Sequence, residues 1–205
     1  MHPPLRQRCR TMTRWSMRVL LKLVIDCDPD AAWRALHSPR AVAELYGPMV
    51  SMSPVVPSGL PTQWEEGDDV PVSLESGPMP LGRQLIHVSH RHVDEPGGAV
   101  RIFRDSGIPL TGPLAFLDVW DHQMAVSPAP GDPTRTLWRD RLVFDGPGAA
   151  LLWPVLWAIW QWRGARIRAL ASSWAHDPAT DTTDTPDTAD TADPATDPAQ
   201  GTGRD

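Results

Sequence analysis

The sequence predicts an α+β fold in which one strand and two short helices precede an antiparallel meander of about six strands and a long C-terminal helix. Three observations predict it: two helix-start signals follow the first extended stretch, apolar stretches alternate with turns in the middle of the chain, and the last apolar stretch has a helical period. A chain of 205 residues is long enough for one such domain with its own hydrophobic core.

The first part of the domain is predicted as one strand followed by two short helices. Residues 19–26 place four large apolar side chains on one face of an extended chain and Lys22 and Asp26 on the other. Asp28 then supplies an N-cap followed by a proline, and Ser38 repeats this signal. We therefore expect a helix to start after each of these two residues.

The middle of the chain, residues 49–145, alternates extended apolar stretches with turn clusters. The turn clusters are Pro57-Ser58-Gly59, Gly77-Pro78, Glu95-Pro96-Gly97-Gly98, Gly112-Pro113 and residues 128–133. This spacing predicts an antiparallel meander of about six strands.

Beyond Gly148 the apolar period becomes helical. The residues that mark one face of the predicted long helix are Trp153, Trp157, Trp160, Gly164, Ile167, Ala171 and Trp174. Residues 149–162 are almost wholly apolar, but this stretch of about fourteen residues contains Pro154 and is shorter than the about twenty residues of a membrane span. We expect no stable membrane insertion. Two roles stay open for this stretch: packing against the rest of the domain, which we favour, or lying at a membrane interface.

Both ends of the chain are predicted to be disordered, which leaves residues 18–175 as the folded domain. Residues 1–17 carry four arginines without apolar periodicity. Candidate translation starts are Met1, Met12 and Met17. Residues 176–205 are rich in Asp, Thr, Pro and Ala and have no large apolar side chain whose burial would offset the entropy of ordering.

The formal net charge of -6 comes from the acidic end of the chain, because residues 177–205 hold eight Asp and one Arg. The remainder carries a net charge of about +1 and has no basic stripe, so no nucleic-acid partner is expected. Cys9 and Cys27 are the only cysteines, which excludes a disulfide framework and a thiolate metal site. Since Lys22 interrupts the first apolar stretch and no small-residue cleavage site follows it, a cytoplasmic location is expected.

Several local stretches resemble a known family. They are Trp64-Glu65-Glu66-Gly67-Asp68, Gly77-Pro78-Met79-Pro80-Leu81-Gly82, Gly112-Pro113-Leu114, Trp120-Asp121-His122 and Arg139-Asp140-Arg141-Leu142-Val143-Phe144-Asp145-Gly146-Pro147. Together with the element order, they resemble the bacterial ligand-binding branch of the START-like (SRPBCC, polyketide cyclase/dehydrase-like) helix-grip superfamily. The resemblance covers about residues 18–174. It implies a helix-grip fold, in which a curved antiparallel sheet of about seven strands wraps around the long C-terminal helix. An apolar cavity between the sheet and the helix would take lipids, polyketides or similar molecules, and the resemblance implies no fixed reaction.

Strand alternation and the helical face indicate which side chains would line such a cavity. The expected ligand-binding residues are Trp120, His122 and Met124 on one strand, Trp138, Asp140, Leu142 and Phe144 on the next, and Trp153, Trp157 and Trp160 on the helix.

His122 and Asp140 are the candidate catalytic residues. If the hairpin turns between Val126 and Thr136, His122 lies directly opposite Asp140, within reach of a hydrogen bond. Three roles stay open for this pair: a self-satisfied structural pair, which we favour, a group that orients a ligand hydroxyl, or a general acid–base pair.

His87, His90 and His92 do not form a predicted metal site. Strand alternation sends His87 to the face opposite His90 and His92, which leaves two imidazoles where zinc needs three or four ligands. The sequence also has no Gly-rich phosphate loop and no nucleophile elbow. We therefore expect no metal and no other cofactor.

The leading hypothesis is a domain that holds an apolar small molecule, lipid- or polyketide-like, as a carrier or sequestering protein. The first alternative is an enzyme of the polyketide cyclase or dehydratase type that uses the Asp-His pair. The second is a membrane-surface or partner-binding protein that uses the Trp-rich helix. Neither the ligand nor the oligomeric state is specified by the sequence.

Overall fold

The computed structural model describes residues 16–174 of the chain. Its elements are β1 (Met17–Ile25), α1 (Pro29–His37), α2 (Pro39–Tyr46), β2 (Ser51–Pro54), β3 (Asp69–Ser76), β4 (Met79–Glu95), β5 (Gly98–Asp105), the 3-10 helix η1 (Pro113–Phe116), β6 (Val119–Ala129), β7 (Asp132–Asp145) and α3 (Ala149–Trp174). The predicted acidic tail and nearly all of the predicted N-terminal extension lie outside the described residues.

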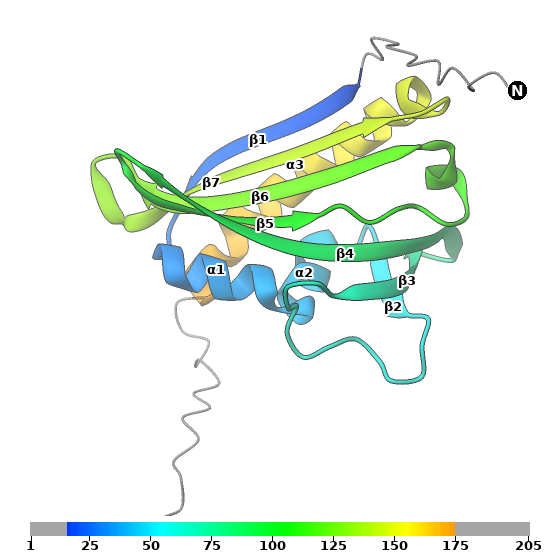
Figure 1. The fold of residues 1–205 in the computed structure, drawn as a ribbon, viewed down its shortest axis with the longest axis horizontal. Coiled ribbons are helices and arrows are strands. Elements are labelled where there is room, and N and C mark those ends of the chain that lie inside the picture. The colour runs from blue at the N-terminus through cyan, green and yellow to red at the C-terminus, as the bar shows by residue number, and fades with distance from the viewer. Residues whose placement is uncertain (1–15, 175–205) are drawn as a thin grey trace, which may run out of the picture.

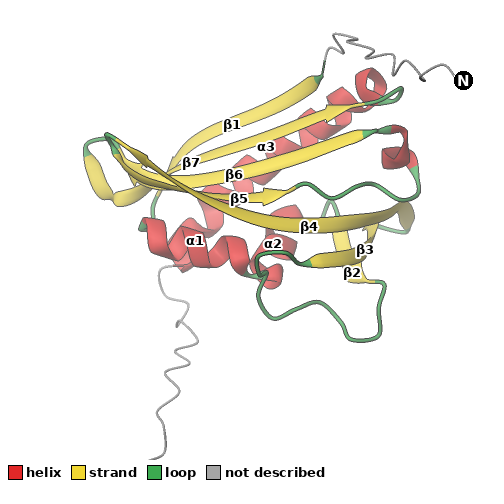
Figure 2. Cartoon of the chain, viewed as in Figure 1, coloured by secondary structure: helices red, strands yellow, loops and turns green. Residues whose placement is uncertain are grey.

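The seven strands form one antiparallel sheet in the order β1-β7-β6-β5-β4-β3-β2. The sheet curls into a half-barrel, and α3 runs behind it and packs against β1 (Figure 1). The other two helices contact α3 and each other, and the long β2–β3 connection extends from the edge of the sheet that carries β2 (Figure 2). The predicted α+β helix-grip architecture, with six strands between the short helices and the long helix, is confirmed.

Side-chain caps fix the starts of the two short helices. Asp28 Oδ1 accepts hydrogen bonds from the backbone N–H groups of Asp30 and Ala31, both at 2.9 Å. Ser38 Oγ accepts one from the N–H of Ala41 at 3.2 Å, and a proline follows each cap. Such caps satisfy backbone donors that have no partner inside a helix, so both predicted helix starts are explained by local chemistry.

Two groups of buried apolar side chains fill the space between the sheet and the helices. One lies between α1, the second half of α3 and the strands, and it includes Leu36, Trp138 and Trp174. The other lies between the first half of α3 and the strands β1, β6 and β7, and it includes Leu142 and Trp160. Residues of both groups border the cavity that forms the candidate site.

The inward face of α3 differs in part from the predicted stripe. From Trp160 onward the predicted positions are buried, but Trp153 and Trp157 are 36% and 47% exposed. In this first half of the helix the buried positions include Leu156 instead. The reason is that residues 149–162 are apolar on all sides, so the helical period alone does not select the face that turns to the sheet.

Two histidines, one on α1 and one on β4, pack against each other. The ring centroids of His37 on α1 and His90 on β4 lie 4.6 Å apart, and both rings also contact Trp33 and Phe103. Burial is the largest cause of the lowered pKa of each histidine, and for His37 the neighbouring His90 and Arg101 lower the pKa further. The folded protein therefore favours neutral imidazoles at this contact.

We predict that acidification destabilises the fold through these histidines. A pKa that is lower in the folded than in the unfolded chain gives a stabilising contribution above the unfolded value of about 6.5, which is lost as the pH falls toward the folded value. Urea denaturation at about pH 7.5 and about pH 5.5 should show this loss, and His37→Gln should reduce it. His87→Gln, on the outer face of the sheet, is the matched control. An unchanged loss in the His37 variant would contradict the assignment.

Candidate functional site

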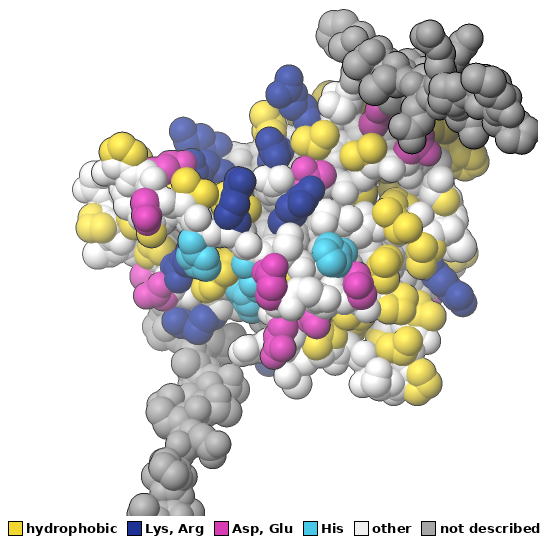
Figure 3. Space-filling view, in the orientation of Figure 1, with side chains coloured by type: hydrophobic (Ala, Val, Ile, Leu, Met, Phe, Trp, Pro, Cys, Tyr) yellow, Lys and Arg dark blue, Asp and Glu magenta, His cyan; other side chains and the backbone are white. Residues whose placement is uncertain are grey.

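A cavity of about 340 Å³ lies between the concave face of the sheet, α2 and the first half of α3. Its apolar wall includes Val42, Val50, Met52, Trp64, Val72, Leu74, Ile86, Phe103, Trp120, Met124, Leu156 and Ile159. The lining extends to Pro113 and Leu114 of η1 and to Val155, which is 56% exposed, so the cavity reaches the surface near η1. Hydrophobic side chains gather on the surface at the η1 end of the sheet (Figure 3). The volume of this cavity and the apolar character of its wall are typical of a site that binds a small molecule.

One connected group of side chains at the cavity is polar, and we call it the Arg163 cluster: Tyr46, His122, Asp140, Trp160 and Arg163. Asp140 Oδ1 accepts a hydrogen bond from Trp160 Nε1 at 2.9 Å and lies 2.9 Å from His122 Nε2. Asp140 Oδ2 forms an ion pair with Arg163 Nη1 at 3.1 Å. The same Nη1 donates to the Tyr46 hydroxyl at 3.2 Å. The cluster thus connects α2, β6, β7 and α3 through direct contacts.

The ion pair of this cluster is fully buried, with side-chain exposures of 0% for Asp140 and 1% for Arg163. Burial alone would raise the pKa of Asp140, but the guanidinium of Arg163 and the contacts with His122 and Trp160 outweigh it and hold the pKa well below its usual range. Asp140 is therefore a buried carboxylate, and Arg163 is its counter-ion.

The pairing of β6 with β7 corrects one detail of the sequence analysis. His122 lies opposite Leu142, and Asp140 lies opposite Met124, so the two residues are diagonal rather than direct partners. The predicted contact still forms, because diagonal neighbours on one face of a sheet remain within reach of long side chains. The register differs by two residues from the expected one, which preserves the inward face of both strands.

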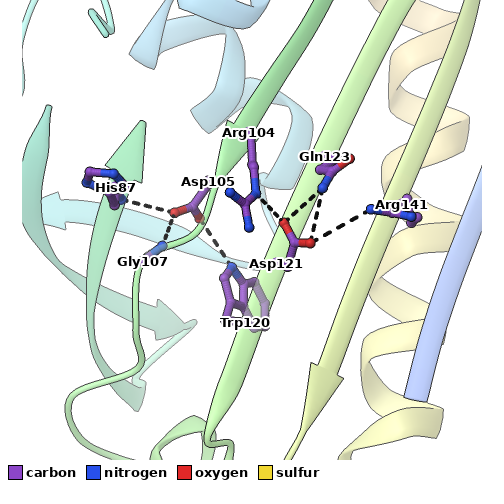
Figure 4. Close-up of polar contacts among 8 residues, drawn as sticks. All are labelled: His87, Arg104, Asp105, Gly107, Trp120, Asp121, Gln123 and Arg141. Atoms are coloured by element: carbon purple, nitrogen blue, oxygen red, sulfur yellow. Dashed lines mark hydrogen bonds and ion pairs between the residues drawn. The ribbon is translucent and has the colours of Figure 1, made fainter. Parts of the chain in front are cut away.

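A second buried carboxyl group, that of Asp105, lines the cavity at the end of β5. Asp105 accepts hydrogen bonds from the backbone N–H groups of His87 and Gly107 and from Trp120 Nε1, at 3.0 to 3.2 Å (Figure 4). Gln84 Nε2 is a fourth donor at 3.4 Å. Burial raises the pKa of Asp105, and the hydrogen bonds and His122 offset only part of this effect. The carboxyl group fixes the loop after β5 and the indole of Trp120.

The outer face of the same strands carries a separate polar network. The Asp121 carboxylate contacts Arg104 at 2.7 Å, Arg141 at 3.8 Å and the amide of Gln123 at 3.1 and 3.2 Å (Figure 4). Asp121 and Trp120 therefore point to opposite faces of β6, as strand alternation requires.

The structure places the predicted ligand-binding residues in three environments. The four that border the cavity are Trp120, His122, Met124 and Trp160. Those buried beyond the cavity lining are Trp138, Asp140, Leu142 and Phe144. Those on the outer side of α3 are Trp153 and Trp157. The Trp153 indole donates to the carbonyl of Arg18 at 3.1 Å, which turns this ring toward the outside of β1.

Four polar residues of the cavity were missed by sequence reasoning: Tyr46, Gln84, Asp105 and Arg163. Arg163 could have been found, because it follows Trp160 by three positions and so lies on the inward side of the helix. An arginine on an apolar helix face signals a buried partner. The other three stand at positions where composition and spacing carry no such signal.

The histidines of β4 are separated as strand alternation predicts. His87 Nδ1 lies 2.8 Å from Asp69 on the outer face, whereas His90 and His92 contact Trp33 on the inner face. Within residues 16–174, no three His, Cys, Asp or Glu side chains are arranged to hold a metal ion. In the same range, no helix combines the length and the apolar character that crossing a membrane requires.

No family model matches the chain, and no curated protein matches it in sequence. Among solved structures, a norcoclaurine synthase point mutant from Thalictrum flavum is 12% identical, with a TM-score of 0.51 over 78% of this chain and 97% of that one. A protein from Nitrosospira multiformis is 11% identical, with a TM-score of 0.50 over 78% and 99%. A START superfamily protein from Mycobacterium smegmatis is 10% identical, with a TM-score of 0.47 over 76% and 97%. The chain has the START-like (SRPBCC) helix-grip fold.

We predict that Arg163→Met lowers the free energy of unfolding by about 3–5 kcal/mol, because Asp140 would stay buried without its counter-ion. Urea denaturation measures this change. Arg168→Met, on the exposed side of the same helix, should alter stability by no more than about 0.5 kcal/mol. Adding Asp140→Leu to Arg163→Met should recover most of the loss. Equal stability of the two single variants would contradict the buried ion pair.

Proposed function

We propose that the protein binds an apolar small molecule, lipid- or polyketide-like, and acts as a carrier or sequestering protein. The observation that supports this most directly is the cavity of about 340 Å³, whose wall is almost wholly apolar and reaches the surface near η1. An apolar molecule that enters this cavity leaves water and gains dispersion contacts with the wall, so the site favours an apolar ligand that fills it.

In this proposal the predicted lining residues divide into two roles. Trp120, Met124 and Trp160 contact the apolar body of the ligand. Trp138 and Phe144, each 0% exposed, hold the sheet and the helix together around the site rather than touch the ligand. The norcoclaurine synthase relative was solved in complex with a transition state analogue, which is consistent with the fold holding an organic molecule.

Nile red, a neutral apolar dye, tests the proposal. Because Trp120 and Trp160 border the cavity, bound dye should quench tryptophan emission. Ala43→Trp places a large ring at the cavity wall and should weaken dye binding by about tenfold or more. Ala165→Trp, on the exposed side of α3, should leave it unchanged. Absence of saturable binding, or equal weakening by both variants, would refute the proposed site.

Acid–base catalysis is a second candidate function, favoured by the 2.9 Å contact between His122 Nε2 and Asp140. A carboxylate that fixes one ring nitrogen of a cavity-lining histidine is the arrangement of a general base. His122→Gln is the discriminating variant, because Asp140→Asn would also leave Arg163 without its counter-ion. If the protein is an acid–base enzyme, the wild type should convert a compound in an extract of its host, and His122→Gln should lower the rate of this conversion about 10²-fold. Binding without conversion supports the carrier.

Membrane-surface or partner binding through the Trp-rich helix ranks below these two functions. Leu151 is 82% exposed, and Trp157 is 47% exposed, which gives α3 an apolar outer side. However, two of its other indoles have structural partners: Trp153 donates to the carbonyl of Arg18 and Trp162 to that of Gly47. These hydrogen bonds give two of the tryptophans of α3 a structural role, so their presence does not by itself indicate a membrane- or partner-binding surface.

A further inference from the structure

The charges at the cavity do not favour an anionic ligand. Arg163 is the only Arg or Lys among the residues that line the cavity in the described part of the chain. Its guanidinium is already paired with Asp140 at 3.1 Å. The carboxyl group of Asp105 lines the cavity as well. A ligand carboxylate or phosphate would therefore lose its hydration without gaining an unpaired cation.

Arg163 Nε is buried without a hydrogen-bond partner, and two other cavity-lining residues of the Arg163 cluster, His122 and Tyr46, keep hydrogen-bonding capacity for a ligand. His122 Nε2 lies 2.9 Å from Asp140 Oδ1, which only accepts hydrogen bonds, and 3.2 Å from Arg163 Nη1, which only donates them. We assign the proton of the neutral imidazole to Nε2 from the shorter of these two contacts, and this tautomer makes Nδ1 an acceptor. The Tyr46 hydroxyl accepts from Arg163 Nη1 and retains its own proton as a donor. Within residues 16–174, neither His122 Nδ1 nor the Tyr46 proton has a hydrogen-bond partner.

The two groups belong to cavity-lining residues that share Arg163 as a neighbour. Arg163 Nη1 is 3.2 Å from the Tyr46 hydroxyl and 3.2 Å from His122 Nε2, and both residues line the cavity. Burial raises the pKa of Tyr46 to about 12, so its phenol stays protonated and able to donate at neutral pH. One small group that both donates and accepts would match this pair.

We infer that the ligand is an uncharged apolar molecule with one hydroxyl group, which donates to His122 Nδ1 and accepts from the Tyr46 hydroxyl. This inference rests on the proposed binding function and adds its specificity: alcohols and phenols are taken, and the corresponding carboxylates are rejected. A hydroxyl is the smallest group that satisfies both partners at once, and it brings no charge to the buried Asp140–Arg163 pair.

Competition with bound Nile red tests the specificity with three molecules of one ring system: 2-naphthol, naphthalene and 2-naphthoate. At neutral pH, 2-naphthol should displace the dye at a concentration about tenfold lower than naphthalene, since it adds two hydrogen bonds. The anion 2-naphthoate should be weaker than naphthalene by about tenfold or more, since its charge would be buried unpaired.

Tyr46→Phe and His122→Phe should each reduce the preference for 2-naphthol over naphthalene. Tyr46→Phe is the safer variant, because it leaves both contacts of Asp140 with His122 and Arg163 intact. Ile86→Val, at the apolar wall, is the matched control and should change the affinity of all three molecules by the same factor.

The outcomes separate this inference from the proposed function. Nile red binding with equal affinity for 2-naphthol and naphthalene, or with 2-naphthoate as the strongest competitor, would overturn the inference and leave the binding function intact. A preference for 2-naphthol that survives in Tyr46→Phe and in His122→Phe would also overturn it. If neither Nile red nor any naphthalene compound binds, the binding function itself fails.

Discussion

The buried ion pair between Asp140 on β7 and Arg163 on α3 sets the position of the long helix. An unpaired buried charge costs several kcal/mol, so α3 can neither rotate nor slide along its axis without a large loss of stability. With Arg163 fixed, Trp160 lies one turn before it and Ile167 one turn after it, and both fall on the buried side. Because Leu156, Ile159 and Trp160 of α3 line the cavity, the position of the helix also fixes this wall of the cavity.

The same contact explains how an apolar cavity can have a polar group at its wall. The charges of Asp140 and Arg163 neutralise each other, and Trp160 and Tyr46 add hydrogen bonds, so the Arg163 cluster does not require a bound ion. Arg163 also lies over the ring of Tyr46, with 5.0 Å from its guanidinium carbon to the ring centroid. A cavity of this kind offers directional hydrogen bonds inside a low-dielectric space, which orients a ligand without adding net charge.

Local signals in the sequence were sufficient to predict the helices and strands. They were not sufficient to predict contacts between residues that lie far apart in the sequence. The caps at Asp28 and Ser38 act within a few residues, and the sequence therefore predicts both helix starts. The β6–β7 register depends on the shape of the connecting turn, and here the expected register was two residues off. Because a shift of two keeps the inward face, the His122–Asp140 contact was still predicted.

The candidate site was predicted less completely than the fold. Strand alternation selected Trp120, His122 and Met124, which all border the cavity. The first half of α3 is apolar on every side, so its period could not show that Trp153 and Trp157 face outward. Asp105 is brought to the cavity by the loop after β5, whose path depends on contacts with residues far away in sequence.

The exposed indole of Trp153 has a consequence for self-association. β1 is an edge strand, and edge strands present free carbonyl and N–H groups to which another copy of the chain can pair. Trp153 occupies the carbonyl of Arg18 on that strand, and the exposed charged residues Arg18 and Lys22 lie along it. The opposite edge, β2, has only four residues and ends at Pro54. Both edges of the sheet therefore resist the addition of a strand from another copy of the chain. This resistance protects the half-barrel, whose edges are not closed by pairing with each other, from growing into a fibre.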